Sequence, residues 1–218
     1  MARRGTDEGN LRITGGDFRG RPLHTPPGKI LRPMRSQVRQ ALFNVLGPSV
    51  QEARVLDLFS GSGCLGLEAL SRGADHAVLV ERAGVCIRAI EQNLETLGAK
   101  DRATVRRHDL NLGVASLVRE GPFDLVLIHP PFELLGRSAK PSQSLDVAAL
   151  LRSLPAQAGL LAPDATLAFE TPRGCYPEAE VADALAGLEV ERRKDYGSTT
   201  LFVTRALAGA EGETEEAS

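Results

Sequence analysis

Acidic residues stand at or near the ends of three successive apolar stretches of the sequence. Asp57 lies near the end of "RVLDLF", Glu81 ends "HAVLVE", and Asp109 ends "ATVRRHD". If these stretches are neighbouring parallel strands, their carboxyl ends meet at one edge of a sheet, where α/β proteins bind ligands. Acids there can hold an amino-acid cation, both hydroxyls of a ribose and an adenine amine, which together describe S-adenosylmethionine. Taken singly, each acid is equally well a surface carboxylate or a loop cap.

The first of these stretches runs into the glycine-rich turn "SGSGCLG". Glycines let the backbone approach a ligand closely and adopt dihedral angles closed to other residues. Gly61, Gly63 and Gly66 also satisfy the G-x-G-x-x-G pattern of dinucleotide sites, so a nucleotide-dependent oxidoreductase is an alternative. A carboxylate at Asp57 would repel a pyrophosphate, but it can accept hydrogen bonds from a cationic ligand or from the amides of the loop. The chain also lacks a second nucleotide-binding half.

A fourth apolar stretch, residues 123–128, ends in His129, Pro130, Pro131 and Phe132. Prolines cannot continue the hydrogen-bond ladder of a sheet, so this strand end presents polar and aromatic groups at the same edge. A neutral imidazole offers one acceptor nitrogen and an imidazolium offers none. The oxidoreductase alternative leaves this segment unexplained.

The elements that must position these residues follow from the alternation of strand and helix patterns after residue 53. Such alternation predicts an α/β fold with a seven-stranded, mostly parallel sheet. The last two strands are separated only by "GS", which is too short for a crossover and predicts an antiparallel C-terminal hairpin. The predicted strands are 54–59, 76–81, 103–109, 123–128, 165–170, 189–196 and 199–206, and the predicted helices are 64–72, 83–98, 146–154 and 178–188.

The front of the chain is basic, although the 218 residues together carry a net charge of −2. Residues 1–54 hold ten Arg or Lys against four Asp or Glu, a net +6 that leaves −8 for the rest. This segregation indicates contact with a polyanion. The pattern predicts a hairpin around Gly15-Gly16 and then a helix with Arg35 and Arg39 on an outward face. Its expected inward stripe is Val38, Ala41, Leu42 and Val45.

Composition excludes several classes of protein. A chain with 42% hydrophobic residues can bury the core of one main domain. No run of about 18 apolar residues is present, and no apolar segment follows the first arginines, so we expect a cytoplasmic protein. The three cysteines are far apart, which predicts no disulfide framework and no metal site.

Several segments resemble the bacterial RsmD-like class I methyltransferases, which methylate guanine N2 of 16S rRNA. These segments are "VLDLFSGSGCLGLEALSRGA", "VER", "HD", "FDLVLIHPPF" and the opening "LRITGGDFRGRPLHTPPGKILRPMRSQVRQALFNVL". The resemblance covers about residues 11–205. It implies a Rossmann-like fold, S-adenosylmethionine as methyl donor, and 16S rRNA or an assembling small ribosomal subunit as partner. We expect residues 11–50 to form an RNA-binding hairpin-helix extension, residues 51–206 the methyltransferase domain, and residues 1–10 and 207–218 disordered ends, in a monomer.

Three groups of site residues follow from the motifs and the resemblance. The predicted donor-binding residues are Asp57, Phe59, Ser60, Gly61, Ser62, Gly63, Glu81, Arg82, Asp109 and Leu110. The predicted catalytic residues are His129, Pro130, Pro131 and Phe132. The predicted RNA-binding residues are Gly15, Gly16, Arg19, Arg21, Arg32, Arg35 and Arg39.

The chain departs from the family at one catalytic position, because the motif of amino-methylating relatives has Asp or Asn where this chain has His129. The side chain there and the Pro130 carbonyl would draw the amine hydrogens of guanine, while Phe132 stacks on an extruded base. His129 is therefore an acceptor or base, a remnant of a lost activity with RNA binding kept, or an adaptation to another nucleophile. The second interpretation gives the alternative function, a catalytically weakened RNA-binding or ribosome-assembly protein.

Overall fold

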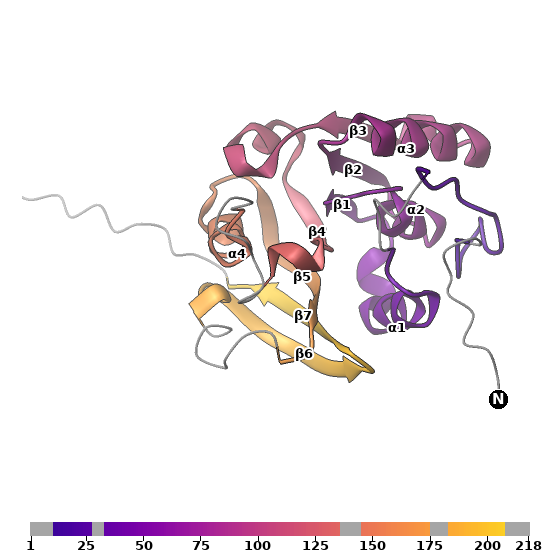
Figure 1. Ribbon diagram of the computed structural model, residues 1–218. Helices are drawn as coiled ribbons and strands as arrows, with labels where there is room; N and C mark the ends of the chain where they lie inside the picture. Colours follow the sequence, from indigo (N-terminus) through magenta and orange to yellow (C-terminus); the bar gives the residue numbers. More distant parts are fainter. Residues whose placement is uncertain (1–10, 28–32, 136–144, 175–182, 208–218) are drawn as a thin grey trace, which may run out of the picture.

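A central seven-stranded sheet organises the computed structural model, which describes residues 11–27, 33–135, 145–174 and 183–207 (Figure 1). The strand order is β3-β2-β1-β4-β5-β7-β6. The strands β1 to β5 are parallel neighbours, and β7 pairs antiparallel with both β5 and β6. The predicted α/β fold and its C-terminal hairpin are confirmed. The strands are β1 Arg54–Leu58, β2 His76–Glu81, β3 Ala103–Arg107, β4 Phe123–Ile128, β5 Leu161–Pro172, β6 Leu188–Tyr196 and β7 Thr199–Ala206.

Helices cover both faces of the sheet (Figure 1). Helices α1, α2 and α3 lie over one face, and α4 lies over the other together with the 3-10 helix η5. Val55 and Leu125 face the layer formed by α1, α2 and α3, whereas Leu56 and Val126 face the second layer, formed by α4 and η5. Strands buried on both faces need apolar residues at successive positions, which explains the continuous apolar runs in the sequence. The helices are α1 Ser36–Leu46, α2 Cys64–Ser71, α3 Gly84–Leu97 and α4 Val147–Ala156; the 3-10 helices are η2 Gly47–Val50, η3 Lys100–Arg102, η4 Leu110–Leu112, η5 Ala115–Glu120 and η6 Phe132–Leu134.

The front of the chain is packed onto the main core. Leu11, Ile13 and Leu23 belong to the same hydrophobic cluster as Val55 of the sheet. The predicted hairpin is reduced to one β-bridge, between Arg12 and Pro22. Three backbone hydrogen bonds support this bridge, from the amides of Ile13, Gly20 and Leu23 to the carbonyls of Arg21, Ile13 and Leu11. Residues 11–50 and the sheet share one apolar core.

Helix α1 forms where the pattern predicts it, but the predicted inward stripe is wrong in part. Its buried residues are Val38, Arg39, Leu42, Phe43 and Leu46. Val45 is 40% exposed. Phe43 and Leu46 are buried where Val45 was expected, and the inward face also includes Arg39, which was expected outside.

Some predictions fall outside the described residues. These are the ends 1–10 and 208–218, Arg32, and residues 178–182 of the helix predicted at 178–188. In the described part of that segment the prediction is largely wrong, because only residues 183–184 are helical, 185–187 form a turn, and Leu188 begins β6. Within the described ranges no helix is long and apolar enough to cross a membrane. The same ranges contain no group of three His, Cys, Asp or Glu side chains placed to hold a metal ion.

Candidate functional site

The predicted donor-binding and catalytic residues come together at one edge of the sheet. β1, β2 and β4 run parallel, with β1 between the other two. Their carboxyl ends therefore lie side by side and carry the glycine turn, Glu81 and His129. Asp109 follows β3 one strand further out. The expectation that these groups share one edge is confirmed.

The turn after β1 is held in an unusual backbone conformation. Phe59 has a φ of 61°, and Gly61 and Gly63 have φ values of 57° and 78°. A positive φ at a phenylalanine costs about 1–3 kcal/mol and persists only where neighbours enforce it. The Ser60 hydroxyl donates to the Asp57 carbonyl at 2.7 Å, and the Gly63 amide donates to the Ser60 carbonyl at 2.7 Å. The turn is thus rigid before any ligand arrives.

Asp57 is 1% exposed and lies beneath this turn. Its Oδ2 accepts a hydrogen bond from the Gly66 amide at 2.9 Å, while its buried Oδ1 has no hydrogen-bond partner among the described residues. Burial raises the pKa of Asp57 to about 7, and the charge of Glu81 adds to that rise. A buried carboxylate oxygen without a partner is costly, which marks it as a candidate ligand-binding atom.

Gly66, the last glycine of the G-x-G-x-x-G pattern, is required by packing, and no bound nucleotide is needed to explain it. A Cβ there would lie 2.2 Å from a methyl carbon of Leu79 and 3.2 Å from Asp57 Oδ2. Only glycine therefore lets the first turn of α2 approach β1 and β2 closely enough to donate its amide to Asp57. The sequence pattern reflects close packing between helix and strands.

Glu81 organises the loops on both sides of the edge. Its Oε2 accepts from the Gly61 amide at 2.9 Å, and its Oε1 accepts from the amides of Arg82 and Ala83 at 2.8 and 2.9 Å. The residue is only half-buried. Each carboxylate oxygen can accept more than one hydrogen bond, so Glu81 retains capacity for ligand hydroxyls.

Asp109 and Arg82 form the outer part of the edge. Asp109 Oδ1 accepts from the Asn111 amide at 3.0 Å, and its Oδ2 lies 3.6 Å from an Arg82 nitrogen. The Asn111 amide, and then the Asn111 side chain and Arg82, hold the pKa of Asp109 below its usual value. Leu110 is buried in the second core layer. Asp109 is thus an ionised, accessible acceptor.

His129 has a partner that the sequence did not reveal. Its Nε2 lies 2.9 Å from Oε2 of Glu170, which is 3% exposed and belongs to β5. Pro130 is buried and Phe132 is half-buried. The rings of His129 and Phe132 are tilted by 56° with centroids 6.3 Å apart, so they do not stack on each other. The only sequence signal for Glu170 was an acid ending the apolar run "ATLAFE".

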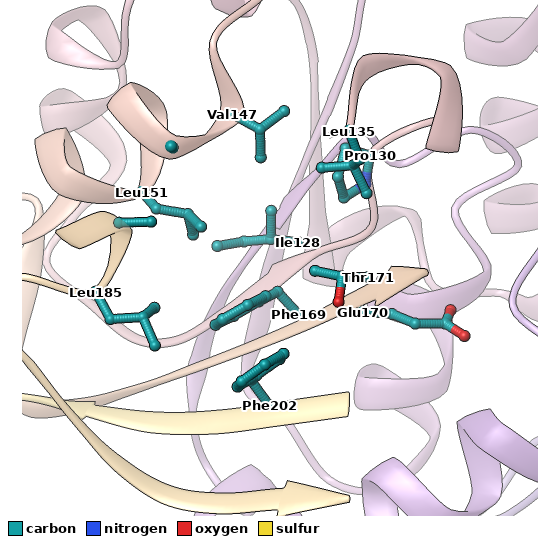
Figure 2. A pocket seen from close by; sticks show the side chains of 12 residues that line it. Ile128, Pro130, Leu135, Val147, Leu151, Phe169, Glu170, Thr171, Leu185 and Phe202 are labelled. Carbon is teal, nitrogen blue, oxygen red and sulfur yellow. The ribbon is translucent and has the colours of Figure 1, made fainter. Parts of the chain in front are cut away.

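An apolar pocket lies beside this strand end, between the sheet and α4. It encloses about 430 Å³, including space open to solvent, and Pro130 and Leu135 form part of its wall. Figure 2 shows Phe169 beside Phe202 in this pocket, with the carboxylate of Glu170 directed away from it. The rings of the two phenylalanines are 4.7 Å apart and nearly parallel. The pocket and the His129–Glu170 pair thus lie on opposite faces of β5.

The predicted RNA-binding residue Arg39 is buried, contrary to the expectation that it points outward. It is 0% exposed, and its Nε lies 3.2 Å from Oε2 of Glu68 in α2. Its other nitrogens donate to the carbonyls of Met34 and Arg12 at 3.0 and 2.5 Å. The reason is electrostatic: a buried carboxylate in α2 requires a cation, and α1 supplies it. Arg39 therefore joins the front of the chain to the sheet domain.

The other predicted RNA-binding residues lie at different places on the front of the chain. Arg19 and Arg21 are exposed, and Arg21 donates to the Thr96 carbonyl at 2.5 Å. Arg35 is exposed but donates to the Tyr196 carbonyl in the β6–β7 hairpin at 3.1 Å. Gly16 packs on the end of α2, where a Cβ would lie 1.7 Å from the Ser71 carbonyl oxygen. Gly15 lies against Arg72 in the same place.

Asn93 of α3 connects the front of the chain to the glycine turn. Its Oδ1 accepts from the His24 amide at 2.6 Å, and its Nδ2 donates to the carbonyls of His24 and Ser62 at 3.0 Å. The residue is 0% exposed. This contact was not predicted, because an asparagine within "AIEQNLETL" gives no sequence signal for a partner 69 residues away.

The sheet order, the glycine turn and the strand-end acids define the Rossmann-like methyltransferase fold. The chain belongs to the family described as "Conserved hypothetical protein 95", whose model matches residues 11–205. The resemblance inferred from the motifs is thereby confirmed at the level of the family.

Named relatives agree with this assignment. The chain is 33% identical over 194 residues to "Putative rRNA methyltransferase YlbH" of Bacillus subtilis, covering 88% of this chain and 97% of that protein. It is 42% identical over 125 residues to "Ribosomal RNA small subunit methyltransferase D" of Escherichia coli, covering 57% of this chain and 61% of that protein. The solved structure "Putative methyltransferase yhhF from Escherichia coli" superposes with a TM-score of 0.71 at 31% identity, covering 92% of this chain and all of that one.

Proposed function

We propose that this protein transfers a methyl group from S-adenosylmethionine to the exocyclic N2 of a guanine in 16S rRNA. The observation that carries the proposal is the His129-Pro130-Pro131-Phe132 segment at the end of β4, beside the glycine turn of β1. Relatives named as rRNA methyltransferases support the choice of substrate. The target is naked rRNA or an assembling small subunit.

The residues at the edge of the sheet fit the donor. The orphaned Oδ1 of Asp57 suits the donor's ammonium, because an ionised carboxylate accepts a charge-assisted hydrogen bond there. Glu81, half-buried at the next strand end, suits the two ribose hydroxyls, and the half-buried carboxylate of Asp109 suits the adenine amine. Bound there, the donor would supply a methyl group activated by a sulfonium.

The chain's own residues would then orient the nucleophile. The lone pair of guanine N2 is delocalised into the ring, so acceptors must draw its hydrogens and turn the nitrogen toward the methyl group. We assign the acceptor role to the His129 side chain and the Pro130 carbonyl, which follow the end of β4. Phe132 is half-buried, and we assign to its ring the stacking on an extruded base, which would offset part of the few kcal/mol lost on unstacking.

Residues 11–50 form the proposed RNA-binding extension of the methyltransferase domain at 51–206. Because Ser71 and Thr96 lie at the ends of α2 and α3, the exposed Arg19 and Arg21 lie toward the opposite edge of the sheet from the glycine turn. We assign phosphate contacts to these two residues. Arg39 is excluded from this role by its burial.

The double replacement Arg19→Gln and Arg21→Gln should weaken RNA binding and flatten its salt dependence. Each phosphate contact to single strands contributes roughly 0.7 to the slope of log K against log salt, so the slope should change by about 1.4. Filter binding of rRNA fragments at several salt concentrations measures it. Arg119→Gln is the control, since Arg119 is exposed on η5, over the other face of the sheet. Equal slopes for all three proteins would contradict the assignment.

Methylation itself is tested with 16S rRNA and 30S particles from cells that lack this protein. Purified protein with radiolabelled S-adenosylmethionine should label one nucleotide, and mass spectrometry should identify it as N2-methylguanine. Donor binding and RNA binding without transfer to either substrate would instead support the RNA-binding and assembly function. Transfer to a different base or atom would support the third interpretation of His129.

A further inference from the structure

We infer that Glu170 is the positioning residue of His129, and that it restores to the catalytic strand end the negative charge that histidine lacks. The inference rests on the proposed function. It concerns the position at which this chain departs from the Asp or Asn of the motif, and it assigns a role to a buried acid on a neighbouring strand.

The register of the sheet brings the two residues together. Ile128 of β4 pairs with Phe169 of β5. The residues that follow them, His129 and Glu170, are therefore also neighbours. Side chains alternate along a strand, and with Phe169 in the apolar pocket Glu170 is directed away from it (Figure 2). Glu170 is thereby aimed at the imidazole, with Nε2 and Oε2 at 2.9 Å.

The surroundings of Glu170 keep it ionised. Burial pushes its pKa upward, but the hydrogen bond from His129, the neighbouring Thr199 and the charge of Arg35 act against burial, and the pKa lies below its usual value. An ionised carboxylate only accepts hydrogen bonds, so the proton of this bond belongs to Nε2 of His129. The pair therefore fixes the tautomer of the imidazole.

Fixing that tautomer determines what the ring offers to a substrate. In a neutral imidazole with its proton on Nε2, Nδ1 carries the lone pair and is the only acceptor. The side chain of His129 is 16% exposed and that of Glu170 is 4% exposed, so the imidazole is the member of the pair that a ligand can reach more easily. A carboxylate behind the ring also stabilises an imidazolium when Nδ1 takes a proton.

The transfer then balances as follows. The N2 lone pair of guanine forms the new N–C bond to the methyl carbon while the C–S bond breaks, and the electron pair of that bond remains on sulfur as a neutral thioether. N2, now positively charged, gives one proton to Nδ1 of His129. The resulting imidazolium is paired with Glu170 and afterwards releases the proton to water. A motif Asp would have met the amine directly; here the imidazole lies between amine and carboxylate.

The test is a double-mutant cycle of Glu170→Gln in two backgrounds. With His129 present, Glu170→Gln should lower kcat for 30S methylation about 10- to 100-fold, as expected for weakening a general base. In the His129→Asn background, where an amide acceptor needs no tautomer control, the same replacement should change kcat less than about 2-fold. Asn is preferred to Asp because Asp would face Glu170 with a second negative charge. Equal losses in both backgrounds would overturn the inference.

A second readout does not depend on activity. Nitrogen-15 NMR of the resting protein distinguishes the two neutral tautomers of imidazole, and His129→Asn identifies the His129 signal among the chain's four histidines. The wild type should show the Nε2–H form and Glu170→Gln a mixture of both forms, with unchanged affinity for S-adenosylhomocysteine. An unchanged tautomer in Glu170→Gln would refute the pairing. If the wild type shows the expected tautomer but methylates no RNA, the proposed function fails and the pairing stands.

Discussion

Replacing Glu68 with glutamine is expected to lower the free energy of unfolding by about 3–5 kcal/mol, as when one partner of a buried ion pair is removed. Arg39 and Glu68 are both 0% exposed. The Glu68 carboxylate also accepts from Arg72 Nε at 2.9 Å, and from the Thr14 amide and hydroxyl at 2.8 and 2.6 Å. An amide cannot satisfy all these donors, so Arg39 would remain buried without a counter-charge. Urea unfolding at neutral pH measures the change.

Glu95→Gln is the matched control for this replacement. Its ion pair with Lys100 spans 3.3 Å, but the two side chains are 72% and 58% exposed. Such surface pairs contribute about 0–1 kcal/mol. Similar small losses in both variants would show that the Arg39–Glu68 pair does not hold the front of the chain to the sheet domain.

Asp57→Asn should weaken the binding of S-adenosylhomocysteine about 10- to 100-fold, corresponding to roughly 1.5–3 kcal/mol for a hydrogen bond to a charged group. The loss follows because the buried Oδ1 is the proposed partner of the ligand's ammonium. With a pKa of about 7 in the free protein, wild-type Asp57 must release a proton before pairing. Wild-type affinity should therefore fall as the pH drops below 7, and that of the variant should not. Calorimetry between pH 5.5 and 8, chosen to bracket that pKa, measures both.

Asp57→Asn also has a predicted effect on stability without ligand. The folded-state pKa of about 7 lies above the ordinary value of 3.8, so protonation stabilises the fold at low pH and this stabilisation is lost as the pH rises from about 4 to 7. Each pKa unit corresponds to about 1.4 kcal/mol, so the variant should gain a few kcal/mol relative to wild type over that range. Asp109→Asn, at an accessible acid, should show no such gain. If the difference in the free energy of unfolding between Asp57→Asn and wild type does not change between about pH 4 and 7, the pKa of Asp57 is not raised and the prediction is wrong.

Much of the fold and the edge of the site could be predicted from the sequence. Buried parallel strands require continuous apolar runs, and crossovers require the helices between them, so the chain order of elements implied the sheet. The acids and the histidine-proline segment stand out because each follows such a run. Periodicity also identified the inward face of α3, where Cys86, Ile90 and Leu94 are all buried.

The pairings between distant charges could not be predicted. Arg39 looked like a surface arginine because its partner, Glu68, is in another helix and within an apolar segment, "CLGLEALS", in which every residue is buried. Glu170 belongs to β5, and the register of β5 against β4 cannot be predicted from a single sequence. In both cases the signal was an acid inside or ending an apolar run, where a charge needs a partner.

The contacts of the front of the chain have a consequence for the order of events during synthesis. Residues 11–24 leave the ribosome before the groups that hold Thr14 and His24, which lie 54 and 69 residues later, in α2 and α3. Until Glu68 and Asn93 have been made, Thr14 and His24 have neither their carboxylate nor their asparagine partner. Closing such long loops is slow compared with local helix formation. We therefore expect residues 11–24 to become ordered after α2 and α3, although they are made before these helices.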